Sequence, residues 1–468
     1  MAINTKVWTN AANTESGKFV EIINDARFPP TSASTDPAFG TVRINEYPKY
    51  AVLTYDVSKN QTNGSAFGDN SSLDAFGRLR ITEPRTLFDS KFITGKSAYT
   101  FDEVLSGSAT STHVRGDSLV ALSTTATNSF AIRQTFTHFN YQPGKSTQVL
   151  CTGLFTPQTN VIKRIGLFQG LSSVPYLPDD GIYLQSDNNT VSFHVLKTAG
   201  TASHLSAAQA DWNVDRLDGT GPSGITIDFT KAQIVTFDYE WLGIGRVRCG
   251  FVIGGITYYV HYFENINALT EPYMSSPNHP IRYEIRQTGA GTGLLKQICS
   301  TVIVEGGEEN VGTSLTTDTS SGLSVDTTLR PLLALRLNPT SIDLVAVLKN
   351  IQFHNTGNTA IYYKVVVDPT ITGGSLGTFS AIDGYTDVQS AQGSATLSLS
   401  GGYDLVSGFV PSGNSAVASG AGNQAIDREL IRLGSKIDGS PVVVVIAGKA
   451  LTGTATSVYT TANLEIRA

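Results

Sequence analysis

The sequence has little charge and no long apolar run, and each shortage excludes a class of protein. Charged residues make up 15% of the chain, against about 25% in an average soluble protein. The 33 basic residues are scattered and the net charge is −6, which disfavours a broad basic face for nucleic acid. No apolar run approaches the length of about 18 residues that a transmembrane helix needs, so membrane insertion is not expected. The opening residues, MAINTKVWTN, lack the apolar core of a signal peptide.

Cysteines and helical patterns are also scarce. Only three cysteines occur, Cys151, Cys249 and Cys299. An odd, sparse count argues against a disulfide framework. We expect all three to be small buried residues, and a bridge between two of them is the less favoured alternative. One segment, IDRELIRLG from Ile426 to Gly434, is a candidate helix because an aspartate could cap it and a glycine could end it.

Strand-forming and turn-forming residues are abundant instead. Glycine accounts for 45 residues, above the usual share of about 7%. Segments such as TQVLCTGLF (147–155) and TVSFHVLK (190–197) alternate apolar and polar residues, and Gly, Asn, Asp and Pro clusters separate them. This pattern predicts an antiparallel sandwich or barrel over residues 73–305.

Composition predicts three further regions along the chain. Residues 1–72 are rich in turns and predict either an extended arm that attaches the chain to a neighbouring subunit or a flexible tail. Residues 306–331 have few hydrophobic side chains and predict a linker. Residues 332–468 predict a second β domain, whose first strands would meet at HNTGNTA, a Gly/Asn turn of the hairpin type.

The segment DWNVDRLDGTG partly matches a calcium-binding loop. Asp211, Asn213 and Asp215 match its first three ligand positions, where alternate oxygens converge on a hard cation. However, Arg216 stands where the loop needs glycine, and Pro222 stands where it needs glutamate. Two interpretations stay open, a looser Ca²⁺ site and a turn whose side chains bond their own backbone. No other cofactor is expected.

The densest aromatic stretch begins FDYEWL at Phe237 and places two carboxylates two residues apart. On a strand, Asp238 and Glu240 share one face, and the aromatic residues Phe237, Tyr239 and Trp241 share the other. We expect the aromatic face in a core and the carboxylates on a solvated outer or concave face. Glycoside hydrolysis uses two carboxylates about 5 to 10 Å apart. The E-x-D-x-x-E run of laminarinase-type sandwiches is absent, so we expect no enzyme.

The rest of this stretch, through Phe263, predicts two more strands of the same sheet. Gly254 and Gly255 fit the turn of a two-residue hairpin. The return strand would carry four apolar or aromatic residues on one face: Ile256, Tyr258, Val260 and Tyr262.

Several long motifs in a fixed order resemble a family of virion structural proteins from tailed bacteriophages and large double-stranded DNA viruses. They are DAFGRLRITEPRTLFDSK (74–91), TFTHFNYQPGKS (135–146), the run from ADWNVDRLDGTGPSG to GRVRCGFVIGG (210–255) and PIRYEIRQTG (280–289). The C-terminal region resembles a β module of similar phage proteins more loosely. The resemblance implies a concanavalin- or lectin-like sandwich and a place on the particle, and it supplies no catalytic residues. Head decoration, head fibre and tail or fibre component all stay open.

The expected fold is therefore all-β, with a lectin-like antiparallel sandwich, a second β-sandwich domain and an extended N-terminal arm. The expected function is that of a non-enzymatic structural component of a virion, made in the host cytoplasm. It would assemble with other virion proteins through subunit contacts, as a homotrimer or in many copies.

Two other functions compete with this one. The first is a receptor module for a host surface glycan, in which Trp241, Tyr258, Tyr259 and Tyr262 would stack on sugar rings. The same aromatic residues could equally belong to a core. The second is a polysaccharide depolymerase that uses Asp238 and Glu240.

Overall fold

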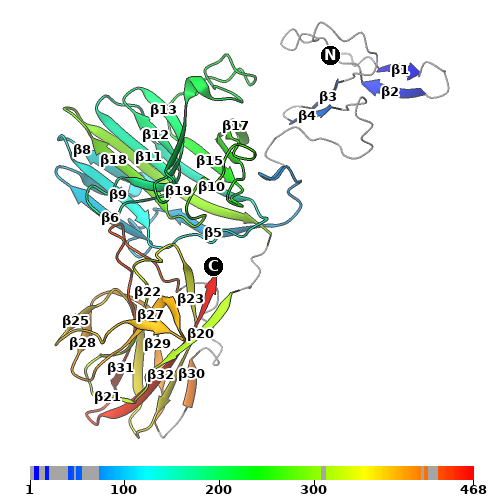
Figure 1. The fold of residues 1–468 in the computed structure, drawn as a ribbon. Coiled ribbons are helices and arrows are strands. Elements are labelled where there is room, and N and C mark those ends of the chain that lie inside the picture. Colours follow the sequence, from blue (N-terminus) through cyan, green and yellow to red (C-terminus); the bar gives the residue numbers. More distant parts are fainter. Residues whose placement is uncertain are drawn as a thin grey trace. The chain divides into compact units, whose positions relative to one another are not determined.

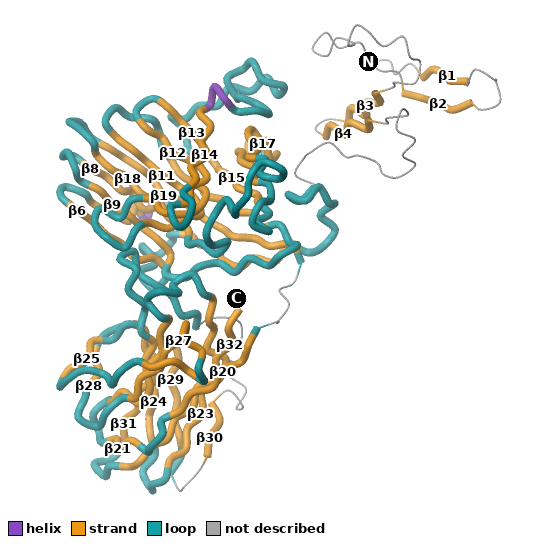
Figure 2. The backbone as a smooth tube through the Cα atoms, viewed as in Figure 1, coloured by secondary structure: helices purple, strands orange, loops and turns teal. Residues whose placement is uncertain are grey.

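The computed structural model describes residues 73–306, 312–412 and 431–467, together with the backbone of a few strands outside these ranges. Among the residues that the structure describes, strands hold 54% and helices 2%, so the predicted all-β class is confirmed (Figure 2). Within the described ranges the helical residues form two short 3₁₀ turns, η2 (Arg115–Asp117) and η3 (Gln209–Asp211). No helix in the described ranges has the length and apolarity to cross a membrane.

The chain forms two compact units, Met1–Arg80 and Ile81–Ala468. Within the first unit, β1 (Thr5–Thr9) pairs with β2 (Ser16–Val20). Likewise β3 (Thr41–Glu46) pairs with β4 (Lys49–Thr54). Apart from these strands, the predicted arm at residues 1–72 lies outside the described residues.

The second unit begins with a sandwich of two antiparallel sheets (Figure 1). One sheet follows the order β17 (Ile256–Phe263), β16 (Val247–Ile253), β15 (Gln233–Tyr239), β10 (Thr147–Leu154), β19 (Gly293–Glu305), β8 (Leu119–Thr124) and β7 (Thr110–Val114), with β5 (Pro84–Lys91) also paired to β19. The other follows the order β14 (Ser203–Ala208), β13 (Thr190–Lys197), β12 (Pro178–Asp187), β11 (Val161–Gly170), β18 (Ile281–Gln287), β9 (Phe130–Thr135) and β6 (Phe101–Ser106).

Alternating side chains of both sheets build one core between them. Val149 and Phe237 enter it from the first sheet, and Ile165 and Phe193 enter it from the second. Because successive strand residues point to opposite faces, their neighbours in sequence lie on the outer faces of the sandwich.

The strand β19 is the most extensively paired element of this sandwich. Along one edge it pairs with β10 from Lys296 to Val304. Along the other edge its first half pairs with β8 and its second half pairs with β5. Three strands from distant parts of the chain therefore meet on one 13-residue strand.

The three strands predicted from the aromatic stretch are confirmed as the neighbours β15, β16 and β17. Gly254 and Gly255 have φ values of 61° and 81°, which a two-residue hairpin turn requires. The predicted shared face of the return strand is wrong. His261 pairs with Cys249 and Tyr259 pairs with Gly250, so a bulge at Val260 shifts the alternation.

The cysteine prediction holds for two residues of three. Cys151 and Cys249 are buried and Cys299 is exposed, and all three are free thiols. Burial raises the pKa of the Cys151 thiol to about 12, so this thiol is an inert packing group.

A second antiparallel sandwich follows, which confirms the predicted second β-sandwich domain. Its smaller sheet has the order β20 (Thr313–Asp318), β32 (Thr456–Arg467), β23 (Val345–Asn355) and β30 (Ala416–Ser419), with β21 (Leu323–Val325) also paired to β32. Its larger sheet has the order β26 (Ser380–Ile382), β27 (Tyr385–Gln392), β22 (Arg330–Leu337), β31 (Val444–Ala450), β24 (Ile361–Val367) and β29 (Tyr403–Val410). A separate ribbon joins β25 (Thr370–Thr372) to β28 (Ser398–Ser400).

The predicted linker at 306–331 is wrong over its described part from residue 312 onward. It contains β20, β21 and the start of β22, and the first two strands pair with β32. Each of these two threonine-rich strands has one buried apolar residue, Leu315 in β20 and Val325 in β21. One apolar residue per strand is too few for the composition to indicate a strand.

The predicted hairpin at HNTGNTA is also wrong, because β23 and β24 lie in different sheets. The Asn355 amide donates to the Thr359 and Pro411 carbonyls, at 2.8 and 3.2 Å. Its Oδ1 accepts from the Gly357 N–H and the Thr456 hydroxyl. These bonds fix the connection by which the chain passes from β23 in one sheet to β24 in the other, where the local sequence had predicted a hairpin.

The predicted helix at 426–434 falls largely outside the described residues. Its described end, from Ile431 to Gly434, is not helical. Arg432 instead forms an isolated antiparallel bridge with Val347.

Candidate functional site

The carboxylate of Asp238 lies inside a polar network, so its predicted solvated position is wrong. The side chain is fully buried. Oδ2 accepts from Arg248 Nη2 at 2.5 Å and from the Tyr259 hydroxyl at 2.6 Å, while Oδ1 accepts from the Ser146 hydroxyl at 2.5 Å. A guanidinium and two hydroxyls thus satisfy a carboxylate that the sequence pattern placed in water.

Glu240 is also buried, at 5% exposure, and it closes a turn. Its Oε1 accepts from the Arg246 N–H at 3.1 Å, and its backbone carbonyl accepts from the Tyr273 hydroxyl at 2.7 Å. A Cβ at Gly245 would lie 2.5 Å from Glu240 Cγ, so the turn admits only glycine there. Both carboxylates are buried and hydrogen-bonded to groups of the protein. Glycoside hydrolysis requires two carboxylates that reach the substrate, and neither of these faces a solvent-filled cleft.

The four aromatic candidates for sugar stacking are only partly accessible. Tyr259 is buried against Asp238 and lies 4.2 Å below the Arg248 guanidinium. The Trp241 indole packs against the core and donates to the Met274 carbonyl at 3.3 Å. Tyr258 and Tyr262 are half-buried. Their use as a sugar platform stays a prediction.

The calcium candidates lie in a loop whose polar side chains bond the backbone. The Asn213 amide bonds both the N–H and the carbonyl of Tyr262, each at 2.9 Å. The Asp215 carboxylate accepts from the Leu217 N–H at 2.9 Å and from the Ser223 N–H at 2.8 Å. Asp211 is exposed. This is the arrangement of the second interpretation, while calcium binding stays a prediction.

The residues that the structure describes contain no group of three His, Cys, Asp or Glu side chains close enough to hold a metal ion.

A charged cluster on the outer face of the β14–β6 sheet was not singled out from the sequence. We call it the arginine face, and it consists of Arg164, Arg282, Glu284 and Arg286. The Glu284 carboxylate is fully buried and forms ion pairs with all three guanidinium groups. Arg282 Nη2 also donates to the Tyr176 carbonyl at 2.5 Å, and Arg286 Nη2 donates to the same carbonyl at 2.9 Å.

A ladder of rings continues the arginine face across neighbouring strands. Phe168 and Tyr183 have ring centroids 4.8 Å apart, Tyr183 and His194 stack at 4.9 Å, and His194 and His204 stack at 5.1 Å. His194 Nδ1 and His204 Nε2 share a hydrogen bond of 2.8 Å. The ladder starts at a fully buried phenylalanine and ends at an exposed histidine.

The electrostatic environment of this surface is positive. Burial and then the neighbouring His204 and Arg164 lower the pKa of His194 to about 3. Burial and Arg164 also lower the pKa of His204. Burial would raise the pKa of Glu284, but the three arginines outweigh it and hold that pKa well below its usual range. The charge of Arg164 therefore acts on both histidines of the ring ladder.

The sequence does carry a signal for this cluster. In PIRYEIRQTG, Arg282, Glu284 and Arg286 alternate with Ile281, Tyr283 and Ile285. Period-two alternation puts the charged residues on one face of a strand. Pattern alone does not reveal that this outer face is buried, because the covering groups, such as the Tyr176 carbonyl, come from a loop about a hundred residues away.

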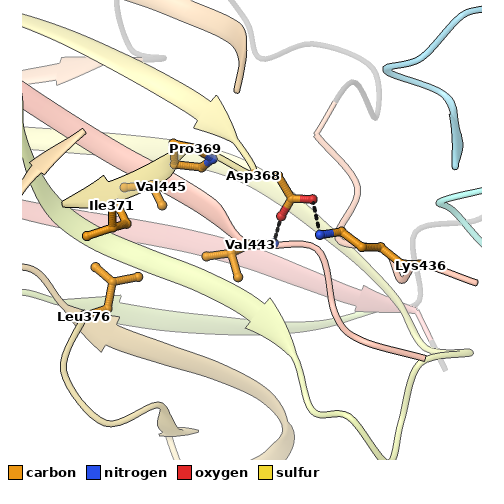
Figure 3. A pocket seen from close by; sticks show the side chains of 7 residues that line it. All are labelled: Asp368, Pro369, Ile371, Leu376, Lys436, Val443 and Val445. Carbon is orange, nitrogen blue, oxygen red and sulfur yellow. Dashed lines mark hydrogen bonds and ion pairs between the residues drawn. The ribbon is translucent and has the colours of Figure 1, made fainter. Parts of the chain in front are cut away.

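A small hollow of about 180 Å³ lies in the second sandwich (Figure 3). Its walls are apolar: Pro369, Ile371, Leu376, Val443 and Val445. The polar groups at its rim bind each other, because Lys436 pairs with Asp368 at 2.9 Å and Asp368 also accepts from the Val443 N–H at 3.0 Å. These interactions leave no converging polar groups for catalysis.

No family model and no curated protein sequence matches the chain. Solved structures similar to it include the Emp47p carbohydrate recognition domain, with 12% identity, a TM-score of 0.31 and coverage of 47% of this chain and 96% of that one. A legume lectin-like domain from Entamoeba histolytica has 10% identity, a TM-score of 0.29 and coverages of 44% and 90%. An endo-beta-1,4-glucuronan lyase from Trichoderma reesei has 14% identity, a TM-score of 0.30 and coverages of 48% and 96%.

Proposed function

We propose that this chain is a non-enzymatic structural component of a virus particle, present in several copies and held there by subunit contacts. Support comes from the motifs that resemble virion structural proteins. In the structure, the polar residues of these motifs stabilise the fold. Asp215 accepts backbone hydrogen bonds in a loop, Glu240 closes a turn, and Asp238 and Glu284 form ion pairs with arginines.

The single observation that carries the proposal is the position of Asp238. It was the best candidate for a catalytic carboxylate, and it is fully buried between Arg248, Tyr259 and Ser146. A carboxylate that must accept or release a proton for a substrate needs contact with that substrate. The Asp238 carboxylate on β15 instead joins Arg248 on β16, Tyr259 on β17 and Ser146 just before β10, which is a structural role.

Particle fractionation tests the proposal directly. Particles from cells that express the gene would be banded on a density gradient, and peptide mass spectrometry would follow the chain across the fractions. We expect the chain in the particle band at a fixed ratio to the major shell or tail protein. A chain found only in the soluble fraction would refute a structural role on the particle.

The copy number is tested on the purified chain by light scattering after size exclusion. We propose a homotrimer, or a larger symmetric assembly that forms around the particle. A trimer would identify a self-sufficient unit. A monomer that stays monomeric when it is mixed with purified particles lacking the chain would exclude assembly by subunit contacts.

Glycan recognition is a second candidate function, and the arginine face is the observation that favours it. Arg164 retains 11% side-chain exposure and the neighbouring His204 is exposed, so polar side chains on this outer sheet face are within reach of a ligand. We do not extend this candidate to polysaccharide cleavage. Incubation of the chain with host capsule or wall polysaccharide is expected to leave the polymer length unchanged on a sizing column.

A further inference from the structure

The arginine face has more positive than negative charge. Three guanidinium groups surround one carboxylate, Glu284. The other acceptors of these arginines are neutral: the Tyr176 carbonyl and the side-chain oxygens of Gln134 and Gln185. Among the described residues the cluster therefore keeps a formal surplus of two positive charges in a chain whose net charge is −6. Buried charge without a counter-ion is unfavourable by several kcal/mol for each ion, so the surplus calls for an anionic partner.

The cluster has a closed end and an open end. At the closed end, Arg282 and Glu284 are fully buried, and Arg286 has 9% exposure. At the open end, Arg164 retains 11% side-chain exposure, Gln185 is half-buried and His204 is exposed. An anion from solution would meet the arginine face at this open end.

Neutral hydrogen-bonding groups extend the open end across four strands. Arg164 on β11 pairs in register with Gln185 on β12, and Gln185 pairs with Ser192 on β13. Ser206 on β14 stands opposite His194 and is exposed. Four adjacent strands span about 14 Å at a spacing of about 4.8 Å. This width suits an extended hydroxylated chain rather than one small ion.

We propose that the open end of the arginine face, from Arg164 to His204, binds a carboxylate-bearing saccharide. Arg164 donates through Nε to Gln185 and through Nη1 to Glu284, and its Nη2 group is placed to donate a charge-assisted hydrogen bond to a carboxylate oxygen of the ligand. The sugar hydroxyls would form hydrogen bonds with Gln185, Ser206 and the exposed imidazole of His204. The site is independent of the proposed structural function, so particle fractionation and the binding experiment below can fail separately.

The test uses the whole chain and a fluorescently labelled trigalacturonate, whose binding is followed by anisotropy at about 0.15 M salt, where exposed charges are well screened. The expected result is saturable binding that unlabelled trigalacturonate displaces. Maltotriose, a neutral trisaccharide, should displace it at least about tenfold less well, since one charge-assisted hydrogen bond accounts for about that factor. Equal displacement by maltotriose, or no binding at all, would overturn the proposal.

Three variants locate the site. Arg164→Gln removes the charge at the open end and should weaken binding about tenfold or more, and His204→Ala should weaken it by a smaller factor. Arg115→Gln removes an exposed arginine from η2, outside this sheet, and should leave binding unchanged. Because His204 is exposed, its variant should fold even if Arg164→Gln does not, and thermal melting checks both. Equal weakening by Arg115→Gln would show non-specific charge attraction and would overturn the site.

Sodium sulfate distinguishes a sugar carboxylate from any oxyanion. If sulfate displaces the labelled probe only at concentrations at least about tenfold above those of trigalacturonate, the neutral groups contribute to binding as proposed. If sulfate displaces it equally well, the arginine face binds simple anions and the saccharide assignment is wrong.

Discussion

The two sandwiches of the second unit share an architecture and differ in what their strands bury. In the first, charged side chains are buried on the outer faces of both sheets, including Asp238 with Arg248 and Glu284 with Arg282. In the second, the described buried charges are Glu465 and Arg467, and the cores consist mainly of Leu, Ile and Val. The same layered fold can thus be stabilised in two ways.

This difference has physical consequences. An ion pair in a low-dielectric interior is sensitive to the loss of one partner, because the remaining charge stays buried. An aliphatic core loses stability in proportion to the volume removed and has no titrating group. We therefore expect single charge changes and acid to act on the first sandwich and cavities to act equally on both.

The largest effect is expected for Glu284→Gln. The variant keeps the shape of the side chain and leaves three arginines without their shared carboxylate, so the free energy of unfolding should fall by about 3–5 kcal/mol. Denaturant unfolding gives the total, and hydrogen exchange shows whether protection is lost in β11 and β18. A change below about 1 kcal/mol would mean that solvent already screens the cluster.

A cavity in the second sandwich should have the next largest effect. Ile446 is fully buried in its core, and Ile446→Ala should cost about 3 kcal/mol through lost burial and the space left behind. Hydrogen exchange should speed up in β31 and its neighbours β22 and β24. If exchange in β11 and β18 rose by the same factor, the two sandwiches would unfold as one cooperative body and the comparison would not hold.

Acid should weaken the first sandwich with a smaller effect. The pKa of His194 is lowered to about 3 in the folded chain, while an unfolded histidine titrates near about 6.5. Between these values only the unfolded chain takes up the proton, so stability is full above about pH 6.5 and falls as the pH drops toward 3. At pH 5 the loss is about 2 kcal/mol for this residue.

The measurement is the free energy of unfolding at pH 7 and pH 5 for the wild type and for His194→Gln. The variant should lose less stability on acidification, and Ile446→Ala should lose as much as the wild type. An identical pH response in wild type and His194→Gln would contradict a neutral buried histidine.

The smallest effect is expected for an ion pair on the surface of the second sandwich. Lys364 pairs with Asp404, and the two side chains retain 26% and 52% exposure. Lys364→Met should change the free energy of unfolding by less than about 1 kcal/mol, since exposed pairs are screened and flexible. A loss as large as that of Glu284→Gln would remove the distinction between the sandwiches.

Local alternation was enough to predict strands and neighbouring strand pairs. It placed β15, β16 and β17 in one sheet because a two-glycine turn limits where the chain can go. It did not predict that Asp238 is buried, because Ser146, just before β10, and Tyr259 on β17 approach from other parts of the chain. Tertiary packing determines which groups cover a strand, and the alternation of residues along that strand does not indicate them.

Turn chemistry failed where a side chain redirected the backbone. The residues HNTGNTA suit a hairpin, yet Asn355 ties the turn to Pro411 and Thr456 and sends the chain into the other sheet. Three members of the arginine face could be recognised in PIRYEIRQTG, where charged residues alternate with apolar and aromatic ones. Its fourth member, Arg164, lies on β11, and only the strand order β11–β18 brings it to Glu284.

The pairing of β19 determines how the first sandwich would respond to a mechanical load. Antiparallel hydrogen bonds run perpendicular to their strands, so tension along the strand at Glu305 would shear the bonds to β10 and β5 together. Bonds loaded in shear must yield almost simultaneously, whereas a strand peeled from an edge releases them one at a time. The strand that leads the chain out of the first sandwich is therefore clamped on both edges against being pulled away.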